Sequence, residues 1–103
     1  MSHPALVPGA TAVVTGGAAG IGLAAARRFA ALGLNVCIAD LGNERLAAAA
    51  EAVAAVPGAG QVLSMETDVS RLDQLERLEA AVRERFGGTD VLMNNAGVQP
   101  GSN

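Results

Sequence analysis

A glycine-rich segment near the N-terminus limits the possible folds of this chain more than any other feature. Residues 12–14 are Ala-Val-Val, and residues 15–22 continue as Thr-Gly-Gly-Ala-Ala-Gly-Ile-Gly. Glycine lets the backbone turn sharply and approach a ligand closely, because it has no Cβ atom. An Ala-rich helical pattern follows, and the N-terminus of such a helix directs unpaired N–H groups at an anion. The segment therefore indicates a strand-turn-helix unit that holds a diphosphate.

Short apolar runs alternate with helical patterns along the rest of the chain. They predict strands at residues 10–15, 35–40 and 61–67, a fourth strand beginning at 91–93, and helices at 20–32, 44–56 and 70–86. Uniformly apolar strands that alternate with helices indicate a parallel sheet with right-handed crossovers. The predicted class is α/β, the first half of a Rossmann-like doubly wound sheet, β-α-β-α-β-α-β with strand order 3-2-1-4. Residues 1–9 are expected to be a flexible lead-in, and residues 10–103 one incomplete nucleotide-binding domain.

Two helices carry more detailed predictions. In the 70–86 helix, Ser70 and Asp73 resemble a capping box, and Asp73–Arg77 and Glu79–Arg83 are spaced as i,i+4 ion pairs. The first helix is expected to bury one face, consisting of Ile21, Ala24, Ala25, Phe29 and Leu32.

Composition argues against several classes of protein. The formal net charge is −3, and the seven basic residues are all Arg and form no basic stripe, so neither nucleic acid nor an anionic membrane is an expected partner. No apolar stretch is long enough for a membrane span and the N-terminus does not resemble a signal peptide, which predicts a cytoplasmic protein. Cys37 is the single cysteine and is expected to be a buried, inert thiol. With only His3 besides, no metal-ligand cluster is predicted.

The glycines follow the pattern G-x-x-x-G-x-G at Gly16, Gly20 and Gly22. The strand before them, the helix after them and the second strand beyond favour a dinucleotide site over a plain tight turn. The loop holds Ala18 and Ala19, and has no Arg or Lys that would bind a 2′-phosphate.

Asp40 ends the second predicted strand, eighteen positions after Gly22. A carboxylate there can accept hydrogen bonds from both hydroxyls of an adenosine ribose and would repel a 2′-phosphate. The alternative is that Asp40 only begins the turn Asp40-Leu41-Gly42. The first interpretation favours NAD as the cofactor and makes NADP less probable.

Polar residues also follow the third and fourth strands. Asp68 and Val69 close the third strand beside the expected adenine position, which favours a contact with the adenine; the alternative is that Asp68 forms a turn that caps the next helix. Asn94 and Asn95 end the fourth strand, where they either tie neighbouring loops together or form a simple turn.

Together these motifs resemble the N-terminal, cofactor-binding half of the short-chain dehydrogenase/reductase family, from about residue 10 to Gly97. The resemblance implies that Gly16, Gly17, Ala18, Ala19, Gly20, Ile21 and Gly22 wrap the pyrophosphate, with the Ile21 backbone near the nicotinamide. It implies that Asp40 and Leu41 lie at the adenosine ribose, and Asp68 and Val69 at the adenine. It further implies that Asn95, Ala96 and Gly97 line the cofactor ribose and that Asn94 braces the sheet.

The resemblance also implies an oxidoreductase that moves hydride between the nicotinamide and a secondary alcohol or ketone, usually as a dimer or tetramer. Its members use a Tyr, with a Lys four residues later, as the acid/base pair. This chain has no Tyr and no Lys, so we assign it no catalytic residue and expect it to be inactive alone. Because the second half of the fold is expected to be missing, the fourth strand should present an unpaired edge with apolar surface beside it.

Overall fold

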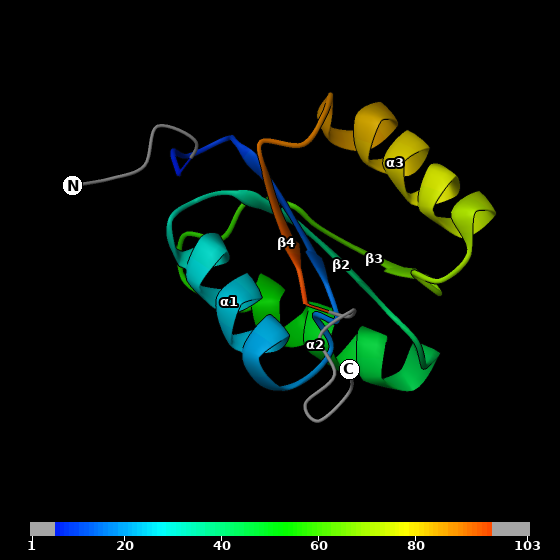
Figure 1. Cartoon of the computed structure of the whole chain (residues 1–103). Coiled ribbons are helices and arrows are strands. Elements are labelled where there is room, and N and C mark those ends of the chain that lie inside the picture. The colour runs from blue at the N-terminus through cyan, green and yellow to red at the C-terminus, as the bar shows by residue number, and fades with distance from the viewer. Residues whose placement is uncertain (1–5, 96–103) are drawn as a thin grey trace.

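Four parallel strands form one sheet at the centre of the molecule, with helices on both faces (Figure 1). The computed structural model describes residues 6–95. Its elements are β1 (Thr11–Thr15), α1 (Gly20–Ala31), β2 (Asn35–Asp40), α2 (Asn43–Ala54), β3 (Val62–Glu66), α3 (Leu72–Phe86) and β4 (Val91–Asn94). The strand order is β3-β2-β1-β4, which confirms the predicted fold class and topology.

The two faces of the sheet bury different side chains, because successive residues of a strand point to opposite sides. On one face, Val14 and Ile38 pack with the small and aliphatic side chains of α1 and α2. On the other face, Val13 and Cys37 pack against Leu78 and other residues of α3. Figure 1 shows α1 and α2 on one side of the sheet and α3 on the other. This arrangement follows from right-handed crossovers, since the chain moves one way from β1 to β3 and returns across the sheet to β4.

The buried face of α1 differs from the predicted one. The residues that the sheet covers completely are Gly22, Ala26 and Ala30, spaced four positions apart, whereas Ile21 and Leu32 are 72% and 47% exposed. Small side chains let the helix axis approach the sheet closely, while Phe29 of the predicted face is partly buried and packs against the same core.

The expected capping box of the third helix is wrong. The helix begins at Leu72, its N-cap position is Arg71, and no side chain caps it. The Ser70 hydroxyl instead donates to the Asp68 carboxylate at 2.6 Å. Asp73 pairs with Arg71 at 3.3 Å in place of the expected Arg77. The Glu79–Arg83 pair forms as predicted, at 2.6 Å.

The N-terminal segment is described from residue 6 onward. Gly9 N–H donates to the Gly33 carbonyl at 3.1 Å, and Ala10 N–H donates to Val7. These hydrogen bonds tie the described part of the expected lead-in to the end of α1. Within residues 6–95, no helix is both long and apolar enough to cross a membrane.

Candidate functional site

The predicted site residues that the structure describes lie at one edge of the sheet, where the carboxyl ends of all four strands meet. Thr15 at the end of β1 pairs in register with Ala39 of β2 and with Asn94 of β4, and Asp40 pairs with Glu66 of β3. The chain passes from β1 to β2 on one side and reaches β4 on the other, so the strand order switches at this point. Ligands of open α/β sheets bind at such a switch in strand order.

The glycine loop connects β1 to the first turn of α1. Gly16 and Gly20 have φ angles of +70° and +57°, a conformation that residues with a Cβ atom rarely adopt. The loop is tied to the sheet because Gly16 N–H donates to the Ala39 carbonyl at 2.7 Å. At the start of α1, Ala19 supplies no side-chain cap and the first turn has no acidic residue. No side chain caps the first-turn N–H groups, which are the donors that a helix N-terminus offers to an anion.

Two other glycines of the loop, Gly17 and Gly22, are required by packing. A Cβ atom on Gly22 would collide with the Gly16 carbonyl oxygen and lie 3.0 Å from the Asn95 side-chain nitrogen. A Cβ atom on Gly17 would lie 2.6 Å from the Ile38 side chain. By contrast, nothing lies within 4 Å of a Cβ built on Gly20, whose position borders open space. Of these three glycines, Gly20 alone has open space where a side chain would lie.

Asp40 holds the glycine loop as well as its own turn. One carboxylate oxygen accepts the Ala18 N–H at 3.0 Å, and the other accepts the Leu41 N–H at 2.8 Å. The side chain is 16% exposed, and a carboxylate oxygen can accept more than one hydrogen bond. Asp40 therefore makes the turn contact that the sequence allowed as an alternative. Its carboxylate oxygens can still accept a further hydrogen bond from a ribose hydroxyl.

Two charged residues beside Asp40 were not among the predicted site residues. An Arg45 Nη atom lies 3.7 Å from the Asp40 carboxylate and donates to the Leu41 carbonyl at 3.1 Å. Glu66 accepts the Gly42 N–H at 3.1 Å. Arg45 lies five positions beyond the strand, in the first turn of α2. Only the folded connection from β2 to α2 brings it back to the strand end.

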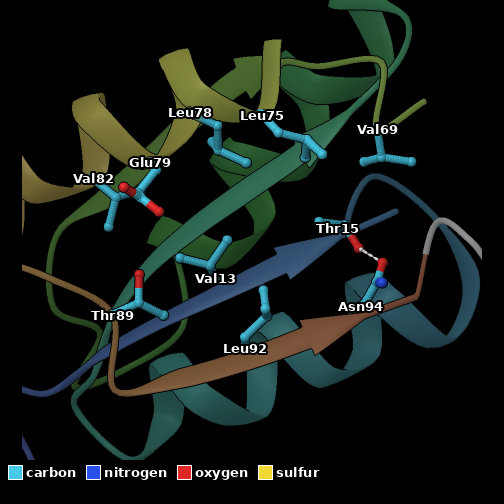
Figure 2. A pocket seen from close by; sticks show the side chains of 10 residues that line it. All are labelled: Val13, Thr15, Val69, Leu75, Leu78, Glu79, Val82, Thr89, Leu92 and Asn94. Atoms are coloured by element: carbon cyan, nitrogen blue, oxygen red, sulfur yellow. Dashed lines mark hydrogen bonds between the residues drawn. The ribbon is translucent and has the colours of Figure 1, made fainter. Parts of the chain in front are cut away.

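Asp68 is engaged in the turn before α3. Its carboxylate accepts both the backbone N–H and the hydroxyl of Ser70, at 3.0 and 2.6 Å. These hydrogen bonds favour the ionised form and lower the pKa of Asp68, with a smaller contribution from Arg71. Asp68 therefore forms the turn that the sequence allowed as an alternative. Its contact with an adenine ring stays a prediction. The Val69 side chain points into a groove on the α3 side of the sheet (Figure 2).

Asn94 and Asn95 tie the end of β4 to the glycine loop. The Thr15 hydroxyl donates to the Asn94 side-chain oxygen at 2.9 Å (Figure 2). The same hydroxyl accepts the Asn95 N–H at 3.0 Å. The Asn95 side chain reaches the Gly16 carbonyl at 3.4 Å. The structure therefore uses both asparagines to hold neighbouring loops together, one of the two alternatives left open. Ala96 and Gly97 lie outside the described residues.

An apolar groove of about 520 Å³ opens between α3 and the exposed part of the sheet; we call it the α3 groove. Figure 2 shows its walls, formed by α3 on one side and by β1 and β4 on the other. Its lining residues are Val13, Thr15, Val69, Leu75, Leu78, Glu79, Val82, Thr89, Leu92 and Asn94. In the described sheet β4 is an edge strand, and Leu92 is 65% exposed. The expected apolar surface beside the fourth strand is therefore present.

Cys37 lies inside the sheet, in a position that the sequence predicted to be buried. Cys37 is fully buried in β2, and burial raises the pKa of its thiol to about 12. A thiol with this pKa is neutral and unreactive at neutral pH, as the sequence predicted. Among residues 6–95, no group of three or more His, Cys, Asp or Glu side chains is placed to bind a metal ion.

Comparison with known proteins agrees with this geometry. A family model described as short chain dehydrogenase matches residues 10–103. An uncharacterized oxidoreductase of Mycobacterium bovis is 42% identical over 88 residues, which are 85% of this chain and 34% of that protein. An L-rhamnose 1-dehydrogenase (NAD(P)(+)) of Azotobacter vinelandii is 42% identical over 92 residues, 87% of this chain and 36% of the relative.

A solved structure shows the same relationship in three dimensions. The L-sorbose reductase of Gluconobacter frateurii, complexed with NADPH and L-sorbose, superposes with a TM-score of 0.84 at 37% identity. The match covers 89% of this chain and 35% of the reductase. The chain thus spans about a third of the length of the proteins it resembles.

Proposed function

This chain belongs to the short-chain dehydrogenase family, and we propose that it is the cofactor-binding portion of an NAD-dependent oxidoreductase. When bound, the nicotinamide would supply or accept the hydride, and the residues of this chain would hold and orient the dinucleotide. In the longer protein, the substrate would be a small molecule with a secondary alcohol or ketone. A cytoplasmic location and a homo-oligomeric state are further parts of the proposal.

The observation that carries the proposal is the uncapped first turn of α1 beside the Asp40 carboxylate. The glycine loop leaves the first-turn N–H groups without a side-chain cap, and Gly20 borders open space. Asp40 is attached to the same loop through the Ala18 N–H at 3.0 Å. A diphosphate on the helix N-terminus would therefore lie beside the carboxylate that binds the neighbouring ribose.

The proposed contacts extend along the strand ends. Ile21 is 72% exposed at the start of α1, as expected of a residue whose backbone borders the cofactor. Leu41 is exposed next to Asp40, at the proposed adenosine ribose. Asp68 and Val69 follow β3 and would border the adenine. We propose that Asn95, Ala96 and Gly97 lie along the cofactor ribose.

We propose that NAD is preferred over NADP because Asp40 presents negative charge where NADP carries its 2′-phosphate. The relatives do not decide this point. The Azotobacter dehydrogenase is named for both cofactors, and the Gluconobacter reductase is complexed with NADPH.

We propose that this chain binds the dinucleotide but lacks the residues that catalyse hydride transfer. The family's Tyr and Lys pair has no counterpart in the sequence, which contains neither residue type. We therefore propose that a longer protein supplies this pair after residue 103, and that the 103-residue chain does not catalyse hydride transfer. A chain that continues without a Tyr and, four residues later, a Lys would instead support a non-catalytic NAD-binding module.

The α3 groove favours a further possibility, that this chain is stable only with a second half. Its walls include the exposed Leu92 on the edge strand β4 and the half-buried Leu75 on α3. A parallel strand added beyond β4 by a right-handed crossover would place its helix on the same face as α3. We propose that such a helix covers the α3 groove in the longer protein.

Isothermal titration of the 103-residue chain with NAD tests the proposed function. Binding with a Kd in the micromolar range, together with no reduction of NAD in the presence of secondary alcohols, supports it. Asp40→Ala should weaken NAD binding and reduce the preference over NADP. Absence of NAD binding by a chain whose circular dichroism spectrum shows a folded α/β protein would contradict the proposal. A chain with no protected amides in hydrogen exchange would support the need for a second half.

A further inference from the structure

One peptide group in the turn after β2 is held between two opposite charges. Arg45 Nη2 donates to the Leu41 carbonyl at 3.1 Å, and the Gly42 N–H donates to the Glu66 carboxylate, also at 3.1 Å. The Leu41 carbonyl and the Gly42 N–H belong to the same peptide group, which joins these two residues. A peptide group has a dipole with its positive end at N–H and its negative end at C=O, so each charge faces the end that it attracts.

The two charged side chains reach this peptide group from different elements. Arg45 lies in the first turn of α2, and Glu66 is the last residue of β3, paired in register with Asp40. The Glu66 carboxylate also contacts the N-terminus of α2, because Gly42 is the N-cap of that helix. Negative charge is favourable there, next to the positive end of the helix dipole. The turn is thus fastened on both sides, to its own helix and to the neighbouring strand.

The backbone of this turn has a second orientation open to it. Gly42 has φ +88°, and glycine adopts positive and negative φ about equally well. Turns that differ by reversal of the central peptide group differ in the sign of φ at the residue that follows it. A reversed Leu41–Gly42 group would direct its carbonyl at the Glu66 carboxylate and its N–H at the Arg45 guanidinium, and both contacts would be repulsive. The two side chains therefore select one orientation of this peptide group.

The carboxylate proposed to bind the ribose is attached to the same turn. Asp40 Oδ1 accepts the Leu41 N–H at 2.8 Å and lies 3.7 Å from Arg45 Nη2. Reversal of the next peptide group would remove the acceptor that holds the Arg45 guanidinium beside this carboxylate. The shape and charge of the turn next to the proposed ribose position therefore depend on the orientation of the Leu41–Gly42 group.

We propose that Arg45 and Glu66 are positioning residues, which hold the Leu41–Gly42 peptide group in one orientation and so pre-form the turn that carries Asp40 for the adenosine end of the dinucleotide. This inference rests on the proposed dinucleotide site. Neither side chain needs to touch the ligand in this role. A turn that is in the binding orientation for only a fraction of the time binds with an affinity reduced by that fraction. Loss of one of these exposed hydrogen bonds should therefore weaken binding of the adenosine end about threefold.

NMR titrations of the 103-residue chain with the two halves of the dinucleotide test the role of Glu66. Glu66→Ala should weaken binding of adenosine 5′-monophosphate about threefold and leave the affinity for nicotinamide mononucleotide unchanged. Glu66→Gln keeps an acceptor oxygen for the Gly42 N–H and should recover most of the loss. Glu51→Ala is the matched control, because it removes the same charge from an exposed residue further along α2.

Two further measurements address the peptide group itself. A hydrogen bond to a carboxylate moves an amide proton resonance downfield, so the Gly42 resonance of the ligand-free chain should move upfield in Glu66→Ala and less in Glu66→Gln. Arg45→Met removes the donor to the Leu41 carbonyl. Because both side chains act on one peptide group, the double variant Arg45→Met with Glu66→Ala should lose less monophosphate affinity than the product of the two single losses.

The possible failures point to different causes. If the Gly42 resonance does not move in Glu66→Ala, or if this variant weakens both ligands equally or neither, the positioning role is overturned and the dinucleotide site stands. Equal losses in Glu66→Ala and Glu66→Gln, or a double variant that shows the full product of the single losses, would overturn the role in the same way. If the folded, unchanged chain binds neither the monophosphate nor NAD, the proposed function fails and the positioning role fails with it.

Discussion

The Thr15 hydroxyl donates to the Asn94 side-chain oxygen at 2.9 Å, across 79 positions of sequence. The same hydroxyl accepts the Asn95 N–H at 3.0 Å. Thr15 is buried at the end of β1, so this oxygen joins the first strand to the last one beside the glycine loop. The fourth strand is therefore fastened at the edge of the proposed cofactor site.

Replacing this hydroxyl by a methyl group should destabilise the chain. Thr15→Val keeps the shape of the side chain but removes its hydrogen bonds to the Asn95 N–H and the Asn94 oxygen, each of which contributes about 0.5–1.5 kcal/mol. Urea denaturation should show the loss as a lower midpoint with an unchanged slope. Thr15→Ser retains the hydroxyl and should lose clearly less. Equal midpoints for the unchanged chain and Thr15→Val would mean that these hydrogen bonds contribute nothing.

Replacing individual loop glycines by alanine should cost different amounts of stability, depending on whether the new Cβ atom has space. Gly22→Ala places a Cβ against the Gly16 carbonyl and should destabilise the chain by about 2 kcal/mol or more, since backbone must move. Gly20→Ala meets no atom within 4 Å and carries only the strain of φ +57°, about 1 kcal/mol.

The two variants should fall in the opposite order for NAD binding, with the larger loss of affinity in Gly20→Ala. Gly20 borders the proposed pyrophosphate position, so Gly20→Ala should weaken NAD binding at a temperature where the chain is fully folded. Thermal unfolding and titration calorimetry on both variants measure the two effects. If Gly22→Ala is as stable as the unchanged chain, α1 does not pack as closely against the glycine loop as it does in the structure.

The local patterns of the sequence predicted the order of the elements and the strand order, for a physical reason. Apolar runs bounded by glycine or proline are short-range signals, and right-handed crossovers leave few ways to arrange them. Hydrophobicity predicted the buried face of α1 only in part: Phe29 packs against the core, but close approach to the sheet selects Gly22, Ala26 and Ala30 as the buried residues.

The site was predictable only in part for a related reason. Asp40 and the glycine loop are marked by spacing from a strand, and their residue types suggest their chemistry. The Ala18 N–H on Asp40, the Ser70 contacts of Asp68 and the position of Arg45 depend on how turns fold back on strand ends. A long side chain such as Arg45 can point in many directions from its place in the sequence, and only the folded turn selects one.

The α3 groove should make the isolated chain bind hydrophobic dyes. Leu92→Gln replaces a side chain that is 65% exposed on the edge strand, so it should lower anilinonaphthalene sulfonate fluorescence and aggregation with little loss of stability. Leu78→Ala is the contrasting change in the same groove. Leu78 is only 5% exposed, and its truncation should cost about 2–5 kcal/mol. Equal losses of stability in the two variants would mean that Leu92 is covered in solution.

Cys37 should control the stability of the chain at alkaline pH. Burial raises the pKa of its thiol from 9.0 to about 12, so between these values the unfolded chain loses a proton that the folded chain keeps. Stability due to this group is therefore fully present below pH 9 and falls as the pH rises, by about 1.4 kcal/mol for each pH unit. The sequence contains no Tyr and no Lys, and Arg stays protonated, so no other side chain titrates in this range.

Urea denaturation between pH 8 and pH 10.5 measures this dependence, with Cys37→Ala as the matched control. The variant loses some packing at every pH, but its free energy of unfolding should no longer fall steeply above pH 9. The two curves should therefore converge as the pH rises. Curves that stay parallel over the whole range would show that the Cys37 thiolate is tolerated in the folded protein, contrary to its complete burial between β1, β3 and α3.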